Sequence, residues 1–513
     1  MSTVETLSPR SIRARSIAKD LSGETLRELA RAGEKTTEYG SPVYSTRVKN
    51  RSAKNTYIVA DGVKAGVMQQ PIDPKKAQDI IRQVQETLAG MDLIQVDRRM
   101  GENPEATLRC RLFVPKDYAR IAFMWHNMLF PSDSSHEPDF VSVYVPDWPE
   151  RLIFCDVNQG YTYILGTDYP GEAKKSMLRQ AMYWIKRRGG LGLHAGSKIL
   201  RVTGPDGQLR DVGFLLFGLS GTGKTTLTLH DHGLQPPEQA IIKQDDVVLL
   251  TRDGRAFGTE DGFYIKTEGL EPSQTVLWGA ATHPTATYEN IKVEDSGKVD
   301  FLDTSLTSNG RGVVLRRFIR GSGEGIDLPK ANKIVFITRR NDIVPVCARL
   351  TPEQAAAYFM LGESIETSAG DPTKAGQAKR EVGTNPFIVG SESDEGNRLL
   401  SILRENPDMQ AYILNTGSIG AKDGVPGEKI SIKVSTEIMK QIAKEGIEWQ
   451  TDPDWGYEVP TNVPGINLEK YTADSYYSDE EYGRLVEKLR AERQAWLAQF
   501  PGLDPAIPDA VEG

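Results

Sequence analysis

The chain is poor in cysteine, has no long apolar run and carries no excess of positive charge, and each absence excludes a class of protein. Its three cysteines, Cys110, Cys155 and Cys347, are scattered over 513 residues without C-x-x-C spacing. This excludes a disulfide framework and a cysteine-based zinc site, and it suits a reducing compartment. No apolar run approaches the roughly 18 residues of a membrane-spanning helix. The formal net charge of −8 argues against a broad nucleic-acid-binding surface.

The first residues, Met1 to Thr6, also lack a basic flank leading into an apolar core, so we expect no secretory signal and a cytoplasmic protein. The content of 39% hydrophobic and 26% charged residues is that of an ordinary soluble globular chain. A chain of 513 residues exceeds the size at which a single core keeps growing. We therefore expect two or three domains.

The most informative stretch is a glycine-rich motif after residue 217, which reads Gly218-Leu219-Ser220-Gly221-Thr222-Gly223-Lys224-Thr225-Thr226. It satisfies G-x-x-x-x-G-K-[ST], with an apolar run before it and a helix-compatible segment after it. In that setting backbone N–H groups and a helix N-terminus surround phosphate oxygens. Lys224 would reach the β- and γ-phosphates, and the Thr225 hydroxyl would hold a divalent metal. The alternative, a glycine-rich turn that matches by accident, does not account for the preceding strand.

Two carboxylates, Asp245 and Asp246, follow a short apolar run at residues 240–242. Phosphate-loop enzymes need such an acid beside the metal, so this pair is a second candidate site element. Residues 247–257 are expected to form a hairpin, and residues 260–267 a strand that carries Lys266.

Three further features each admit two interpretations from the residues alone. Arg51 lies in a polar segment before a β-rich run, which fits an anion-binding loop or a surface loop equally well. Lys174 and Lys175 fall in the first turn of a predicted helix, where the helix dipole disfavours cations. They are therefore either surface residues or placed to meet an anion or a metal. His194 lies in a glycine-flanked apolar run, where a lone histidine is usually a core residue.

Periodicity and turn signals give a mixed α and β pattern along the whole chain. Helices are expected over residues 75–88, from 171 to about 185, over 352–360, from Ser435 or Thr436 to 444, and from a capping box at Ser478 to about 499. Strands are expected at residues 93–97, 108–114, 140–145, 152–155, 333–338, 411–417 and 430–432, with a loop over 449–468. A turn cluster at residues 204–207 places the domain boundary near residue 210.

Together these features resemble the ATP-dependent phosphoenolpyruvate carboxykinase family, from about Arg51 to Leu468. The segments that carry the resemblance are residues 51–54, 169–175, 218–227, 245–246, 266–267, 271–272, 309–311, 349–351, 415–417 and 429–433. The GTP-dependent branch carries a cysteine in the phosphate loop, where this chain has Ser220.

The resemblance implies an α/β fold of mixed α+β elements in two domains, with the active site in the cleft between them. Residues 1–210 would be the substrate-binding domain, and residues 211–513 the nucleotide-binding domain with a C-terminal helical tail.

The resemblance also implies a reaction. Oxaloacetate and ATP would give phosphoenolpyruvate, ADP and CO2, a step of gluconeogenesis. Mg²⁺ would be held by Thr225, Asp245 and the nucleotide phosphates, and Mn²⁺ by Lys175, His194 and Asp246. Nitrogen ligands beside a carboxylate suit Mn²⁺. Lysine ligates only as the neutral amine, so the pKa of Lys175 would have to be lowered strongly.

On the family's pattern, the other site residues divide into three groups. Arg51 would clamp the substrate carboxylate and Tyr169 would position the substrate. Lys224, Lys266 and Arg311 would neutralise charge on the transferring phosphoryl group. The nucleotide would also contact Thr226, Glu271, Lys429, Ile430 and Ser435. The expected partners are the two small-molecule substrates, with no nucleic acid and no membrane, in a monomer or small homo-oligomer.

The chain departs from the family pattern at several positions. Residues 195–198 read Ala-Gly-Ser-Lys in place of Cys-Ser-Ala-Asn, residues 340–346 differ throughout, Ala53 replaces a proline and Ser435 a threonine. These changes spare the metal and phosphate ligands and bear on the lid and the adenine contacts. Two alternatives to the carboxykinase are a phosphate-loop kinase acting on another small anion and a non-catalytic ATP sensor.

Overall fold

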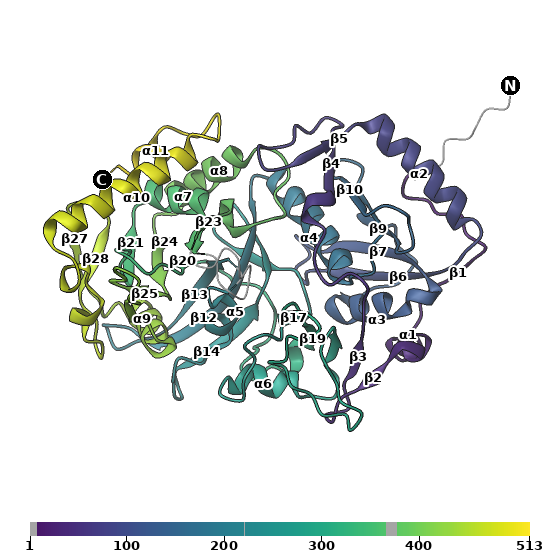
Figure 1. The fold of residues 1–513 in the computed structure, drawn as a ribbon, viewed down its shortest axis with the longest axis horizontal. Coiled ribbons are helices and arrows are strands. Elements are labelled where there is room, and N and C mark those ends of the chain that lie inside the picture. The colour runs from purple at the N-terminus through teal and green to yellow at the C-terminus, as the bar shows by residue number, and fades with distance from the viewer. Residues whose placement is uncertain (1–7, 220, 366–376, 513) are drawn as a thin grey trace. The chain divides into compact units, whose positions relative to one another are not determined.

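A computed structural model describes residues 8–219, 221–365 and 377–512 of the chain. The chain forms two compact units, each built from segments that are separate in the sequence (Figure 1). The first unit contains Met1–Trp184, Thr259–Arg320 and Phe387–Ser391. The second unit contains Ile185–Gly258, Gly321–Pro386 and Glu392–Gly513.

A large mixed sheet forms the centre of the first unit. Its strands run in the spatial order β1 (Ser16–Ala18), β6 (Asp92–Met100), β7 (Leu108–Pro115), β9 (Phe140–Val145), β11 (Tyr161–Leu165), β10 (Leu152–Asp156), β4 (Thr56–Val59) and β5 (Gln70–Ile72), with β8 (Phe130–Pro131) paired to β6. Helix α2 (Pro74–Leu88) packs on this sheet through Ala77, Ile81 and Val84. Asp73 caps α2 by accepting hydrogen bonds from the backbone N–H groups of Lys75 and Lys76.

The first unit also holds a smaller sheet and the remaining helices of its segments. The sheet runs in the order β17 (Gly262–Lys266), β19 (Arg311–Leu315), β18 (Thr287–Glu289), β3 (Pro42–Tyr44) and β2 (Lys35–Thr36). The helices are α1 (Gly23–Ala30), α3 (Ala119–Met128), α4 (Gly171–Lys186) and α6 (Thr275–Ala281). Helix α3 contacts strands of both sheets, which explains why most of its residues are buried.

The second unit is organised around another mixed sheet. The order is β16 (Ala256–Gly258), β15 (Val247–Leu250), β12 (Leu191–Thr203), β13 (Leu209–Gly218), β20 (Lys333–Thr338), β24 (Gln410–Asn415), β21 (Cys347–Leu350), β28 (Glu458–Asn462) and β27 (Glu448–Thr451), with β14 (Gln239–Gln244) paired to β12. Strands β13, β20 and β24 are parallel to one another. Two short ribbons pair β22 (Glu363–Ile365) with β23 (Ala378–Arg380), and β25 (Ser418–Ile419) with β26 (Glu428–Lys429).

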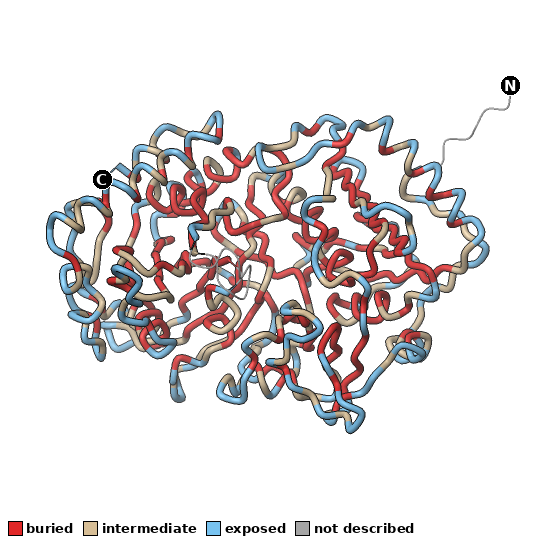
Figure 2. Tube along the Cα trace, viewed as in Figure 1, coloured by how far each residue is buried: buried red, intermediate tan, exposed pale blue. Residues whose placement is uncertain are grey.

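Helices cover both faces of the second sheet, because alternate strand residues point to opposite faces. On one face, Leu227 of α5 (Lys224–Leu229) and Ile438 of α9 (Ile432–Lys444) join a core with Leu216 of β13. On the other face, Phe359 of α7 (Pro352–Leu361) packs edge-on against Phe217. The remaining helices are α8 (Glu392–Glu405), α10 (Asp479–Leu497) and α11 (Ala506–Asp509). Figure 2 shows the buried residues following the strands within each unit.

Most of the expected elements are confirmed. The mixed α/β class, the helices at 75–88, 171 and 352, the strand before the phosphate loop and the 247–257 hairpin are all present. The capping box at Ser478 is also present, with the Ser478 hydroxyl and the Glu481 side chain each accepting the other's backbone N–H. No helix within the described ranges combines the length and the apolarity that a membrane crossing requires.

Three local predictions are wrong. Helix α9 is capped by Ser431, whose hydroxyl accepts from the backbone N–H of Val434, so the predicted caps at Ser435 and Thr436 lie inside the helix. The strand predicted at residues 430–432 therefore does not form. Residues 449–468 contain β28 and most of β27, where only a loop was expected, because β28 adds to the edge of β21.

The compact units divide elsewhere than at the predicted boundary near residue 210. The turn at residues 204–207 connects β12 to β13, which pair in antiparallel fashion from Ala195–Phe217 to Thr203–Leu209 inside the second unit. The chain passes between units near the end of α4 and again after β16, β19 and residue 386. A single boundary inferred from turn residues cannot represent units built from several segments.

Candidate active site

The phosphate loop follows β13 and ends where α5 begins. Gly223 has a φ of +99°, in the left-handed region that favours glycine, and it precedes the first helical residue, Lys224. The carbonyl of Leu219 accepts from the backbone N–H of Thr222 at 3.1 Å and from its hydroxyl at 2.7 Å. The loop therefore turns tightly at the carboxyl end of β13. Ser220, which was predicted to contact the nucleotide, lies outside the described residues.

Two neighbouring parallel strands support this loop at their carboxyl ends. Arg339 follows β20, and its Nη1 donates to the Gly221 carbonyl at 2.9 Å. Thr416 follows β24, and its hydroxyl donates to the Thr222 carbonyl at 2.7 Å. Ligand sites in parallel sheets form at this edge. The loop is thus held in the position that a phosphate-binding loop requires.

The acid pair lies directly beside the loop lysine and threonine. Lys224 Nζ is 3.0 Å from the Asp245 carbonyl and 3.3 Å from Asp246 Oδ1. The Thr225 hydroxyl is 3.2 Å from Asp245 Oδ2. Thr225 and Asp245 together present a hydroxyl and a carboxylate, the hard oxygen ligands that Mg²⁺ accepts.

His194 faces the second acid of the pair. Its Nδ1 is 2.6 Å from the Thr384 carbonyl, which only accepts, so Nδ1 carries the proton. Its Nε2 is 2.9 Å from Asp246 Oδ1. When the ring is neutral and its proton is on Nδ1, the lone pair of Nε2 points toward Asp246 Oδ1, so that two electron-pair donors face each other. A second-sphere carbonyl that fixes the tautomer in this way is typical of metal-bound histidine.

The donor set around His194 and Asp246 fits a divalent metal but does not complete its coordination. Among the residues that the structure describes, no three His, Cys, Asp or Glu side chains gather around one point. The remaining protein ligand would therefore have to be of another kind, as the predicted lysine amine is.

In the first unit, Lys174 and Lys175 begin α4 and neither is a free surface lysine. Lys174 is 3% exposed, and its Nζ is 3.1 Å from Glu260 Oε2. Lys175 Nζ lies 4.9 Å from the centre of the Tyr169 ring. Burial lowers the pKa of Lys175 to about 7 against the pull of Glu172, and the charges of Arg51, Arg311 and Lys174 lower it further. A pKa near 7 allows the amine of Lys175 to lose its proton near neutral pH, and a lysine can bind a metal only after this loss.

The loop that carries Arg51 is tied to the same helix turn. Glu172 Oε1 accepts the backbone N–H of Ser52 at 2.6 Å. Tyr169 is buried, and its hydroxyl is 3.5 Å from Asn309 Nδ2, which also donates to the Lys49 carbonyl at 2.7 Å. These contacts gather Arg51, Tyr169 and Lys175 into one neighbourhood of the first unit.

A row of charged side chains crosses the smaller sheet of the first unit. Lys266 of β17 is directly opposite Arg311 of β19, and Arg311 is directly opposite Glu289 of β18. Like charges in directly opposed positions repel each other, and here Lys266 is paired with Glu268 while Arg311 lies opposite Glu289. Arg311 is oriented by Asn309 Oδ1, which accepts from its Nη2 at 2.8 Å and its Nε at 3.0 Å.

Comparison with known proteins assigns the chain to a family. The family model described as phosphoenolpyruvate carboxykinase matches residues 15–469. The chain belongs to the ATP-dependent phosphoenolpyruvate carboxykinase family. It is 39% identical over 411 residues to phosphoenolpyruvate carboxykinase (ATP) from Aeropyrum pernix, which covers 80% of this chain and 81% of that protein. Proteins of the same name from Sinorhizobium medicae and Geobacillus thermodenitrificans are each 27% identical, over 90% and 92% of this chain and 88% and 91% of their own.

Membership of the carboxykinase family makes the chain an enzyme of the carboxy-lyase class that uses ATP and a divalent metal. Several residues that support the site were not identified from the sequence. Thr384 contributes only a backbone carbonyl to His194, which no side-chain pattern could signal. Glu289 is fully buried, its pKa is raised to about 7 by burial, and it accepts from the Tyr264 hydroxyl. An acid at the end of a short buried strand is the signal that could have revealed it.

For five residues predicted to contact the nucleotide, no interaction among the described residues connects the side chain to the phosphate loop. Glu271 is exposed before α6, and Lys429 is exposed in β26. Ile430 belongs to the core of the second unit. Ser435 is 1% exposed, and its hydroxyl donates to the Ser431 carbonyl. Thr226 is partly buried in α5.

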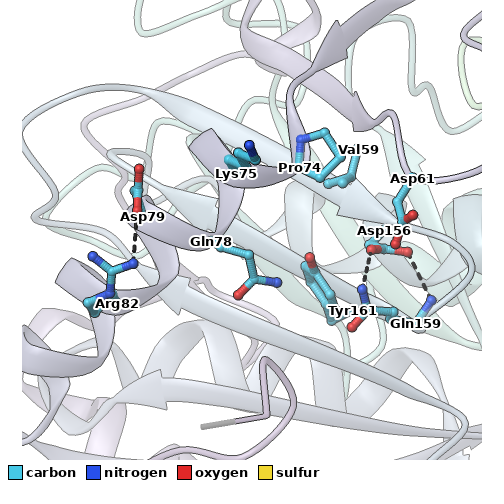
Figure 3. Close-up of a pocket in the computed structure, with 10 residues that line it drawn as sticks. All are labelled: Val59, Asp61, Pro74, Lys75, Gln78, Asp79, Arg82, Asp156, Gln159 and Tyr161. Carbon is cyan, nitrogen blue, oxygen red and sulfur yellow. Dashed lines mark hydrogen bonds and ion pairs between the residues drawn. The ribbon is translucent and has the colours of Figure 1, made fainter. Parts of the chain in front are cut away.

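A surface pocket of about 480 Å³ in the first unit involves none of the predicted site residues (Figure 3). It lies at the start of α2, where Asp79 pairs with Arg82 and Asp156 accepts from Gln159.

Proposed function

We propose that the chain converts oxaloacetate and ATP into phosphoenolpyruvate, ADP and CO2. The observation that carries the proposal is that Asp246 Oδ1 lies 2.9 Å from His194 Nε2 and 3.3 Å from Lys224 Nζ. One carboxylate oxygen thus lies beside both the histidine predicted to bind a metal and the lysine of the phosphate loop. Binding ATP alone needs the loop lysine and a metal acid, but it does not need a histidine held as a ligand beside them.

The second unit is proposed to bind the nucleotide. Backbone N–H groups of residues 218–225 would surround the phosphates, and Lys224 would neutralise charge on the γ-phosphoryl group. Thr225 and Asp245 would hold Mg²⁺, and His194 and Asp246 would hold Mn²⁺. The third predicted Mn²⁺ ligand, the neutral amine of Lys175, belongs to the first unit. When bound, the Mn²⁺ supplies Lewis-acid stabilisation of negative charge on the substrate oxygen.

The first unit is proposed to supply the groups for the organic substrate. The Arg51 guanidinium would clamp a carboxylate through two parallel hydrogen bonds, and Tyr169 would orient the substrate. Loss of CO2 leaves the enolate of pyruvate, whose oxygen attacks the γ-phosphorus while the bond to the ADP oxygen breaks. Lys266 and Arg311 would neutralise the charge that develops on the transferring group.

The reaction is tested with purified protein, oxaloacetate, ATP and Mn²⁺. Phosphoenolpyruvate and ADP are expected in equal amounts, dependent on both substrates. ATP bound without turnover would identify an ATP sensor and reject the proposal. Phosphorylation of a different small anion without phosphoenolpyruvate formation would instead favour the kinase alternative.

The metal assignment is tested with His194→Ala. The variant is expected to require at least about tenfold more Mn²⁺ for half-maximal activity because a ligand is lost, while its ATP affinity stays close to that of the unchanged protein. His136→Ala is the matched control, because His136 is exposed and pairs only with nearby polar residues. Equal loss of Mn²⁺ activation and ATP binding would assign His194 a packing role.

A further inference from the structure

Lys198 is a fully buried lysine that the proposed chemistry does not use. It lies on β12 with 0% of its surface exposed, four residues after His194. It is also the last residue of the 195–198 segment, where the chain departs from its family's pattern. A buried ammonium is costly unless its hydrogens are all accepted. Its partners therefore define its role.

The surroundings of Lys198 supply an acceptor for each hydrogen of a protonated amine, against burial, which lowers the pKa of Lys198 to about 7. Its Nζ is 3.0 Å from the Leu227 carbonyl, 3.0 Å from His232 Nε2 and also within hydrogen-bonding distance of the His230 carbonyl. His232 Nδ1 is 3.0 Å from the Thr436 carbonyl, which can only accept, so Nδ1 carries the proton and Nε2 is free to accept from the lysine. Three acceptors thus meet the three N–H groups of one ammonium.

Two of these acceptors lie at the carboxyl end of α5, and the third, His232, follows that helix and bonds in turn to the Thr436 carbonyl of α9. Leu227 and His230 lie at the carboxyl end of α5, where carbonyls lack helical partners and a cation is stabilising. Thr436 belongs to α9, which packs in the same core. Lys198 therefore connects β12 to the end of the phosphate-loop helix and, through His232, to α9.

The same face of β12 holds α5 at a second point. A Cβ atom on Gly196 would lie 2.2 Å from Thr228 Oγ1, so the strand and the helix are in direct contact there. Residues 194, 196 and 198 share one face of the strand. That face of β12 thus carries the histidine proposed to bind a metal, the glycine that contacts α5, and Lys198.

Helix α5 depends on such contacts for its position. It has six residues, too few for stability of its own. Its first residues, Lys224 and Thr225, are the proposed ligands of the phosphates and the metal. Small displacements of a binding group weaken binding and catalysis strongly.

We propose that Lys198 is a positioning residue of the nucleotide site, which fixes α5 from its carboxyl end and thereby sets the affinity for ATP. This inference rests on the nucleotide site of the proposed function, but not on oxaloacetate chemistry. It can therefore be tested by ATP binding alone.

The test compares Lys198→Met with Lys333→Met by calorimetric titration of ATP with Mg²⁺. Lys333 is a matched control, because it is 6% exposed on β20 of the same sheet and bonds Gln410 rather than α5. Lys198→Met is expected to raise the Kd for ATP about tenfold, since a charged hydrogen-bonding group is lost. Lys333→Met is expected to change it less than about twofold, and the KM for oxaloacetate should stay unchanged in both.

Lys198→Gln gives the conservative comparison and is decisive if Lys198→Met does not fold. Its amide donates two hydrogens, so it should retain part of the contact and give an intermediate Kd. A folded Lys198 variant that binds ATP as the unchanged protein does would overturn the proposal, as would equal weakening by Lys333→Met. Failure of the unchanged protein to bind ATP would instead reject the proposed function.

Discussion

Lys224 shows how much of the site a single side chain defines. Its ammonium bonds to the Asp245 carbonyl and the Asp246 carboxylate, so the residue proposed to bind the phosphates also orients the acid pair. The motif predicted this lysine without any structure, because all fixed positions of a phosphate loop are local in the chain.

Replacing Lys224 by alanine is expected to lower turnover by about 10²-fold or more, because electrostatic stabilisation of a transferring phosphoryl group contributes several kcal/mol. Steady-state kinetics of phosphoenolpyruvate formation measures the effect. Lys298→Ala removes an exposed lysine of the first unit and should leave turnover unchanged. Near-normal kcat in folded Lys224→Ala would exclude the residue from the mechanism.

Other site residues could not be deduced from local sequence. Glu172 anchors the Arg51 loop through a backbone N–H some 120 positions away in the chain. Thr384 fixes the His194 tautomer through its carbonyl, 190 positions away. Contacts of this kind depend on the topology of the sheets, and they leave no spacing that a motif could record.

At the scale of secondary-structure elements, the packing of strand β12 against α5 could not be predicted from the sequence. The strand's hydrophobic pattern and its histidine were visible in the sequence, but its close approach to α5 was not. The glycine at position 196 permits that approach, since any side chain there would meet Thr228. Similarly, β27 and β28 could not be predicted from a segment rich in proline and glycine, because pairing with β21 decides their structure.

Gly196→Ala is expected to destabilise the protein by about 1–3 kcal/mol, because the added methyl group overpacks the contact between β12 and α5. Chemical denaturation measures the change. The double variant Gly196→Ala/Thr228→Ala should recover part of the loss, because it removes the atoms that clash. Gly33→Ala is the control, since nothing lies within 4 Å of its added Cβ. Unchanged stability of Gly196→Ala would contradict the close packing.

At the scale of the whole molecule, a buried ion pair connects helix α10 to strand β22. Arg493 of α10 and Glu363 of β22 are each 1% exposed in their side chains and bond one another directly. Burial raises the pKa of Glu363, but the charges of Arg493, Arg340 and Arg380 outweigh burial and lower the pKa to about 2. This ion pair therefore fixes α10 to β22 within the second unit.

This pair predicts an acid-sensitive contribution to stability. Because the folded-state pKa of Glu363 lies below the ordinary value of 4.5, its contribution is present above pH 4.5 and is lost as the pH falls through about 2. Glu363→Gln should cost about 3 kcal/mol at pH 7, and the difference from the unchanged protein should narrow on acidification. Urea denaturation between pH 7 and pH 3 measures it. Glu405 forms an exposed pair with Arg252, so Glu405→Gln should change the free energy of unfolding little at any of these pH values. If the stability difference caused by Glu363→Gln did not depend on pH, Glu363 would not be the source of the acid-sensitive contribution.

The interleaving of the two units has a consequence for synthesis on the ribosome. Strand β13 leads into the phosphate loop, yet its parallel neighbour β20 begins only at Lys333. At roughly 5–20 residues per second, the nascent loop waits on the order of ten seconds for that neighbour and longer for β24. During this interval one side of an apolar strand has no partner. Folding of the enzyme must therefore include a stage in which β12 and β13 have been synthesised but the strands that complete their sheet have not.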